Sequence, residues 1–163
     1  MLLRLIAENL TSFKEAVEFN TFPSSKSHSH ENHKITCGHA TALRMSAIYG
    51  ANGAGKSNLL QALNLLQALV KTETLRKIDF YDNPTFKLDS QCSGKPLGLA
   101  VEFYYNNNVF YYHVEFTLEE IVLEELLLSK KTKDITLFTR KRTDISIDSN
   151  YIGKGISEQF QDA

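Results

Sequence analysis

The sequence contains few cysteines, no excess of charge of either sign and no long apolar run. Cys37 and Cys92 are its two cysteines. Two thiols far apart, in a chain without an export signal, indicate free thiols in a reducing compartment. Lys and Arg number 18 against 19 for Asp and Glu. The overall charge therefore gives no sign of nucleic-acid or membrane binding and leaves only a local patch open.

The N-terminus also lacks the features of a targeting segment. The opening MLLRLIAENL has one Arg and a short apolar run that Glu8 and Asn9 interrupt, so it has neither the long apolar core nor the cleavage site of a signal peptide. No apolar run approaches the roughly 20 residues that a helix needs to cross a bilayer. We expect a cytoplasmic protein with no membrane partner.

The hydropathy pattern of the first half predicts strands followed by one long helix. Residues 1–22 alternate between apolar and polar and predict an antiparallel strand pair. Residues 23–40 are polar and rich in Ser and His, which predicts a loop. Residues 41–78 contain a short apolar strand ending on Gly50, a glycine-containing loop and a long helix. Because only a narrow stripe of that helix is polar, we expect it to be mostly buried against a sheet.

The second half, residues 79–163, predicts a β-rich region. Its expected strands are a possible short one at 85–88, the two arms of a hairpin at 99–116, and single strands within 119–130 and 135–142. Asn106, Asn107 and Asn108 suit the hairpin turn because Asn tolerates positive φ. Sheet packing explains the run of Tyr and Phe in this hairpin better than base stacking does. The predicted class is α/β, with a mixed sheet and an antiparallel β region, and residues 149–163 show no clear closing element.

The segment IYGANGAGKSNLLQAL carries a phosphate-binding loop. Gly50, Gly55, Lys56 and Ser57 match the pattern G-x-x-x-x-G-K-[ST]. Glycines let the backbone turn tightly so that several N–H groups point at a phosphate. Lys56 would reach the β and γ phosphates as the catalytic residue, and Ser57 would offer its hydroxyl to Mg²⁺. A chance match in a glycine-containing turn is the alternative, and the expected strand before and helix after the loop count against it.

The residues between the glycines narrow the family. GANGAGKSNLLQAL resembles the ABC-type ATPases of the SMC and RecF kind, and so does the opening LLRLIAENLTSFKEAVEF. More closely, the chain is similar to prokaryotic ATP-binding proteins related to OLD-family nucleases and to the ATPases of Septu and retron defence systems. In those proteins the loop, PTFKLD and a hairpin ending in YYHVEF occur in this order. The resemblance covers about residues 1–140.

This resemblance implies a P-loop NTPase, the N-terminal half of an ABC-type head, with ATP and Mg²⁺ as ligands. Its implied partners are a second head in a homodimer, a nuclease and possibly DNA. The implied triphosphate cradle consists of Gly50, Ala51, Asn52, Gly53, Ala54, Gly55, Lys56, Ser57 and Asn58. The first hairpin, around Asn9, Ser12, Phe13 and Lys14, would flank the adenine and ribose. Thr11 stands where these families often have a basic residue, for which Lys14 is a candidate replacement.

Three further parts of an ABC-type head are missing from the sequence. A Walker B strand, a signature segment and a glutamine loop would complete the site. Glu124 and Glu125 follow apolar residues and superficially resemble Walker B, but an ordinary strand explains them better. We therefore expect residues 1–163 alone to hydrolyse ATP at a negligible rate. A non-hydrolysing ATP-binding scaffold and, less favoured, a small-metabolite kinase remain as alternatives.

Two clusters of side chains allow a functional or an ordinary interpretation. The first is His28, His30, His33, Cys37 and His39. Its spacing matches no standard zinc pattern, so a solvated loop is the better interpretation. The second is Lys130, Lys131, Lys133, Arg140, Lys141 and Arg142. A turn could bring these together near a phosphate backbone, but a charged hairpin edge is slightly favoured.

Overall fold

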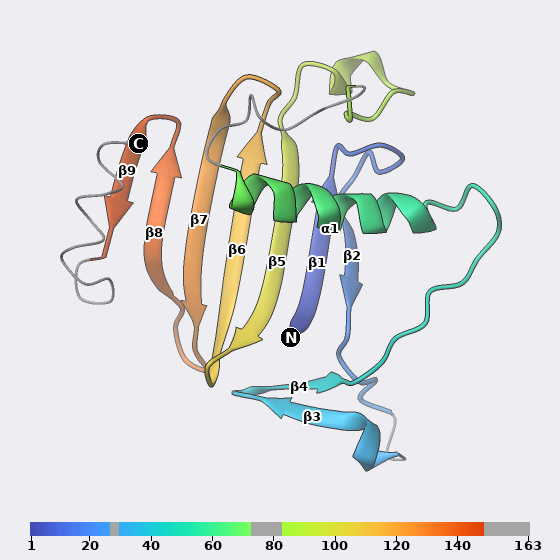
Figure 1. Ribbon diagram of the computed structural model, residues 1–163, viewed down its shortest axis with the longest axis vertical. Helices are drawn as coiled ribbons and strands as arrows, with labels where there is room; N and C mark the ends of the chain where they lie inside the picture. Colours follow the sequence, from blue (N-terminus) through green and yellow to red (C-terminus); the bar gives the residue numbers. More distant parts are fainter. Residues whose placement is uncertain (27–29, 73–82, 149–163) are drawn as a thin grey trace.

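The computed structural model describes residues 1–26, 30–72 and 83–148, and Figure 1 shows one helix lying across a large sheet. The helix, α1, spans Lys56–Lys71. In order across the seven-stranded sheet, the strands are β2 (Val17–Asn20), β1 (Leu2–Glu8), β5 (Leu97–Tyr105), β6 (Asn108–Phe116), β7 (Ile121–Ser129), β8 (Ile135–Lys141) and β9 (Asp144–Ile147). A separate hairpin pairs β3 (Lys34–Cys37) with β4 (Ala40–Leu43). Short 3₁₀ turns cover Glu31–His33 and Ser90–Cys92.

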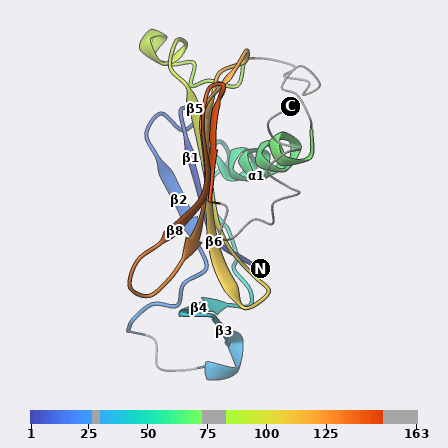
Figure 2. The same cartoon turned by 90° about the vertical axis from the view of Figure 1, so that its left-hand side faces the viewer.

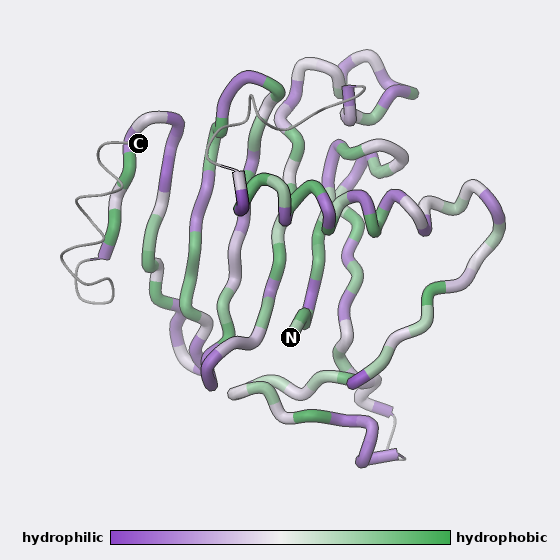
Figure 3. The backbone as a smooth tube through the Cα atoms, viewed as in Figure 1, coloured by the Kyte–Doolittle hydropathy of each residue, from purple (hydrophilic) through white to green (hydrophobic). Residues whose placement is uncertain are grey.

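Alternating apolar residues build the sheet as the sequence predicts, and Figure 3 shows hydrophobic and hydrophilic residues interspersed along its strands. Leu3, Leu5 and Ala7 of β1 are buried, with exposures of 0–2%, and β1 pairs antiparallel with β2. The β5–β6 hairpin turns at Asn106 and Asn107, whose φ values are 45° and 63°. Positive φ at both central residues matches the twist of the strands, which explains the asparagines. The predicted strand pair, the hairpin and the strands β7 and β8 are confirmed.

The expectation of a mixed sheet is wrong for the described residues. Each pairing between its strands is antiparallel. The cause lies in the connections, because β5 to β9 follow one another through short turns, and such turns can join only antiparallel neighbours. The last of these strands, β9, was not expected. It has only four residues and is mostly exposed, so its hydropathy carries little signal.

Helix α1 packs one side onto the sheet. Ala62 and Leu66 are buried and join a core that includes Leu5, Leu99 and Phe116 from β1, β5 and β6. The expectation that the helix is mostly buried is wrong, since Leu60 is 59% and Val70 is 64% exposed. The reason is visible in Figure 2, where α1 has the sheet on one side and no other described element on its outer side. No helix in the described part of the chain has the length and hydropathy needed to cross a membrane.

Three local predictions are also wrong. The apolar strand before the phosphate loop is absent, because β4 ends at Leu43 and residues 44–50 are exposed and belong to no described strand. A strand needs a neighbour for its backbone groups, and the described residues offer none there. Within the predicted loop 23–40, the alternation of Ile35 and Cys37 instead forms β3, with Cys37 fully buried. Residues 85–88 form no strand, since the N–H of Phe86 donates to the Asn9 side chain.

Candidate functional site

The phosphate loop connects the exposed segment 44–50 to the start of α1. Gly53 and Gly55 have φ values of 82° and 86°, a region that L-residues other than Asn and Asp seldom adopt. A Cβ atom at Gly55 would lie 3.0 Å from Cε1 of Phe13 and 3.1 Å from Oγ of Ser12. Glycine at position 55 is therefore required both by the backbone and by the close approach of the β1–β2 turn.

The Lys56 ammonium closes this loop. Its Nζ donates to the carbonyl oxygens of Gly50 at 2.8 Å and Ala51 at 2.7 Å. An ammonium has three N–H donors, so two hold the start of the loop to its end and one is left for another acceptor. The contact fixes a positive charge at the loop while Lys56 itself stays within reach of solvent.

The N-terminus of α1 adds to the positive potential. Gly55 precedes the helix, no side chain caps its first N–H groups, and its first turn has no acidic residue. The first N–H groups of a helix lack intrahelical partners and carry the positive end of its dipole. Such an end attracts anions, phosphates among them. Ser57, in this first turn, is exposed.

The β1–β2 turn, which contains Ser12 and Phe13, lies against the loop. The Nδ2 group of Asn58 donates to Oγ of Ser12 at 2.8 Å, and Phe13 packs beside Gly55 and against the core under α1. The structure thus brings Ser12, Phe13, Gly55 and Asn58 together. Their expected role beside a nucleotide stays a prediction.

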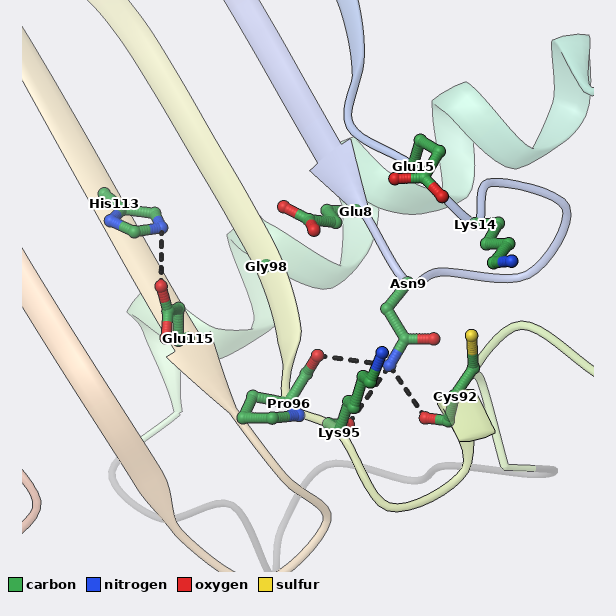
Figure 4. A pocket seen from close by; sticks show the side chains of 10 residues that line it. All are labelled: Glu8, Asn9, Lys14, Glu15, Cys92, Lys95, Pro96, Gly98, His113 and Glu115. Carbon is green, nitrogen blue, oxygen red and sulfur yellow. Dashed lines mark hydrogen bonds and ion pairs between the residues drawn. The ribbon is translucent and has the colours of Figure 1, made fainter. Parts of the chain in front are cut away.

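Asn9 has a structural task that the sequence reasoning missed. Its Nδ2 group lies 3.0–3.1 Å from the carbonyl oxygens of Cys92, Lys95 and Pro96, and its Oδ1 accepts the N–H of Phe86 at 3.3 Å. Figure 4 shows the three bonds of Nδ2, which join the end of β1 to the loop before β5. The residue is 4% exposed, so its amide is not free to flank a nucleotide, which corrects that expectation. The available sequence signal was an Asn directly after a predicted strand, since Asn favours turns and tolerates the positive φ of 50° that Asn9 adopts.

Lys14, the candidate replacement for the missing basic residue, is held in an ion pair. Its Nζ lies 3.0 Å from Oδ2 of Asp89, which raises the pKa of Lys14. The pKa of Asp89 is lowered, first by the backbone N–H of Gln91 and then by Lys14. The charge of Lys14 is therefore already matched. Thr11 donates its backbone N–H to Pro84 at 2.6 Å, and its buried hydroxyl oxygen has no hydrogen-bond partner among the described residues.

The two candidate Walker B carboxylates are engaged within the sheet. Glu124 accepts a hydrogen bond from the Tyr112 hydroxyl at 2.7 Å and lies 3.9 Å from Nη1 of Arg140. Glu125, next along β7, points to the other face and lies 3.4 Å from Nδ1 of His113. This pattern supports the ordinary-strand interpretation that the sequence favoured.

The other two clusters differ from their sequence descriptions. His28 lies outside the described residues. No group of three or more His, Cys, Asp or Glu side chains within the described ranges is arranged to hold a metal ion, and Cys37 is a buried free thiol, as is Cys92. The basic cluster is split, because Lys130, Lys131 and Lys133 lie where β8 begins and Arg140–Arg142 where it ends (Figure 1). Its members therefore do not form one basic patch.

Comparison with known proteins gives one family. A family model described as "AAA domain, putative AbiEii toxin, Type IV TA system" matches residues 45–155. The matched range begins just before the phosphate loop and continues through α1 and β5 to β9. It thus covers more than half of the chain. Among curated proteins, no sequence matches the chain.

Proposed function

Because the chain belongs to this family of AAA domains of the AbiEii toxin type, we propose that it binds ATP with Mg²⁺ at residues 50–58. An AAA domain is a nucleotide-binding P-loop ATPase domain, so nucleotide binding is the activity that the family implies. The proposal adds the choice of ATP, the ligand residues and their roles.

The contact between Lys56 and the loop carbonyls carries the proposal. It holds the ammonium where the loop turns, beside the uncapped N-terminus of α1. Lys, backbone N–H groups and the helix dipole then act on the same anion. Phosphoryl groups are recognised mainly by positioning and by charge neutralisation. In this proposal Lys56 neutralises the β and γ phosphates and Ser57 provides a ligand to Mg²⁺. Ser12 and Phe13 flank the rest of the nucleotide.

Hydrolysis needs groups beyond those described. Phosphoryl transfer requires a residue that orients the attacking water and a carboxylate that holds the metal ion. Glu124 and Glu125 are engaged elsewhere. The exposed apolar segment that includes Met45, Ile48 and Tyr49 supports the idea that further strands pair with it. We therefore assign the catalytic carboxylates to another part of the protein or to a second chain.

The proposed output is an ATP-driven switch. In an ABC-type head similar to the SMC, RecF and OLD proteins, ATP would join two heads in a homodimer and hydrolysis would release them. The switch would control a nuclease or DNA-processing partner in anti-phage defence, as in Septu and retron systems. The family description, which names a toxin of type IV toxin–antitoxin systems, supports a role in defence. Glu124 and Glu125 are already bonded to neighbouring side chains of the sheet, which favours a second candidate function. In this alternative the chain is a scaffold that binds ATP and does not hydrolyse it.

A comparison of nucleotides tests the binding site. If the loop reads the β and γ phosphates, ATP with Mg²⁺ should bind the chain at least about tenfold more tightly than AMP, since each charge-assisted contact contributes about 1.5–3 kcal/mol. Fluorescent ATP displaced by unlabelled ATP, ADP or AMP gives the affinities. Equal competition by AMP and ATP would show that the base and ribose, not the loop, account for binding. A phosphate-release assay distinguishes the two candidate functions, an ATPase and a non-hydrolysing scaffold. It does so only when the part of the protein or the second chain that provides the catalytic carboxylates is present.

A further inference from the structure

One face of the large sheet is not covered by any helix of the described residues. Helix α1 packs against the face formed by Leu5, Ala7, Leu99 and Val114, and Figure 2 shows the sheet edge-on with α1 on that side alone. Because successive side chains of a strand point to opposite faces, their neighbours in sequence lie on the other side. We call this the open face. Its polar residues include Arg4, Glu8, Glu18, Glu102, Tyr111, His113, Glu115 and Glu125. The strand register also places Lys141 of β8 and Asp144 of β9 on this face, in line with Glu115.

Two basic side chains of the open face, Arg4 and His113, each lie between two carboxylates. Arg4 lies 2.7 Å from Glu102 and 3.6 Å from Glu18. His113 lies 3.7 Å from Glu115 and 3.4 Å from Glu125. A neutral imidazole has only one N–H to donate, so a neutral His113 can serve only one of these two carboxylates. A charged His113 carries one positive charge against the two negative charges of Glu115 and Glu125, so one negative charge stays unmatched.

The carboxylates of the open face also affect the hydroxyl of Tyr111. Burial, followed by the charge of Glu125, raises the pKa of its hydroxyl, with Glu102 acting in the same direction and Arg4 against it. The open face is thus acidic over several strands.

A hollow opens in this face where β1, β5 and β6 run side by side. Gly98 of β5 pairs with Glu8 of β1 on one side and with Glu115 of β6 on the other. Since Gly98 has no side chain, a cavity of about 260 Å³ remains between the two glutamates, with His113 also in its lining. Figure 4 shows both carboxylates beside Gly98, on the side of the strands away from α1. Glu8 has no ion pair or side-chain hydrogen bond within the described part of the chain.

We propose that the open face is a docking surface for a lysine- or arginine-bearing segment of a partner protein, with one cationic side chain entering the hollow between Glu8 and Glu115. Two carboxylates on either side of a glycine floor match a single cation, and complementary charge across an interface gives specificity and speeds association. The hollow is smaller than the roughly 300–1,000 Å³ of typical small-molecule sites, which favours one side chain as occupant. A nucleic acid is excluded because its phosphates would meet the same carboxylates.

Two lysines mark the limit of this surface. Lys14 and Lys95 line the loop end of the hollow, and Asp89 holds Lys14 by an ion pair. The cation of the partner therefore approaches from the strand side, over β6, and not across the loop that precedes β5. The surface involves none of the residues assigned to the nucleotide, so its test needs no ATP.

The test measures binding of a labelled decapeptide of alternating Arg and Ser by fluorescence anisotropy. The variant Glu8→Gln/Glu115→Gln removes the two carboxylates of the hollow. Its control, Glu31→Gln/Glu119→Gln, removes the same charge from two exposed positions, on the 3₁₀ turn before β3 and on the β6–β7 turn. We expect the first variant to weaken binding about tenfold, the size of one charge-assisted contact, and the control to change it less than about twofold. Gly98→Ala, which places a methyl group on the floor of the hollow 3.5 Å from Cβ of Glu8 without changing charge, should also weaken binding.

Several outcomes would overturn the proposal. Equal losses in the two double variants would show that the peptide responds to overall charge alone. Absence of peptide binding, or binding of a DNA duplex that the Glu8 and Glu115 substitutions weaken, would remove the open face as a site for a basic protein. Self-association of the chain that disappears in Glu8→Gln/Glu115→Gln would make a second copy the occupant, through its own Lys130–Lys133 turn. Thermal unfolding of each variant shows whether it is folded, and if the double variant is not, Gly98→Ala decides.

Discussion

Gly55 shows how one residue can satisfy two separate constraints. Its φ of 86° is unfavourable for residues with a Cβ atom, and the Cβ position lies 3.0 Å from the ring of Phe13. The sequence motif predicts glycine here from the loop alone. The contact with the β1–β2 turn could not be predicted, because it joins residues far apart in the chain.

We predict that Gly55→Ala lowers the free energy of unfolding by about 1–3 kcal/mol, from the left-handed backbone and the displaced ring. The control is Gly94→Ala, since Gly94 has open space around its Cβ position and no positive φ. It should change stability by less than about 0.5 kcal/mol. Urea denaturation measures both variants. Equal effects in the two would mean that position 55 tolerates a side chain.

At the scale of single elements, the positions of the strands were easier to predict from sequence than the segments that each strand contacts. Alternation in β1 and the asparagines of the β5–β6 turn identify local structure because their signals are local. The segment 44–50 is apolar like a strand but lacks a neighbour among the described residues. Asn9 ties β1 to the loop before β5 through bonds that no periodicity encodes. Sequence therefore predicts elements well and their contacts poorly.

Helix α1 provides a prediction about burial. Leu66 is 4% exposed and belongs to the core, whereas Leu60 is 59% exposed on the outer side of the same helix. Leu66→Ala should cost about 2–5 kcal/mol, through lost apolar contact and a cavity. Leu60→Ala should cost less than about 0.5 kcal/mol. Chemical denaturation of the two variants compares them directly, and a comparable loss at Leu60 would show that its side chain is covered.

The hydrogen bond from the Tyr112 hydroxyl of β6 to Glu124 of β7 provides a prediction about the pH dependence of stability. Burial, followed by the charge of Glu124, raises the pKa of Tyr112 above its ordinary value. A raised folded-state pKa contributes stability that is complete below the unfolded value of about 10 and is lost as pH rises above it. We expect stability to fall above about pH 10 and to fall less steeply in Tyr112→Phe. Thermal unfolding across pH 8–11 measures this, with Tyr105→Phe, at an exposed tyrosine, as control. Identical pH profiles for all three proteins would contradict the assigned environment of Tyr112.

At the scale of the whole molecule, the phosphate loop is formed, and the two candidate carboxylates among the described residues, Glu124 and Glu125, are engaged within the sheet. Gly50, Gly55, Lys56 and Ser57 could be recognised from sequence because their spacing reflects the chemistry of phosphate binding. The engaged state of Glu124 could be seen only in the fold, where Tyr112 and Arg140 reach it from neighbouring strands. We therefore predict that the chain binds nucleotide and that its phosphate release stays negligible until other groups complete the site.

Calorimetric titration of ATP with Mg²⁺ into the wild type, Lys56→Ala and Lys71→Ala tests the central claim most directly. Lys71 lies at the exposed far end of the same helix, so its substitution removes the same charge without touching the loop. We predict that Lys71→Ala binds like the wild type and that Lys56→Ala binds at least about tenfold more weakly, because a charge-assisted contact to phosphate is lost. Equal affinities for all three proteins would contradict the assignment of residues 50–58 as the nucleotide site.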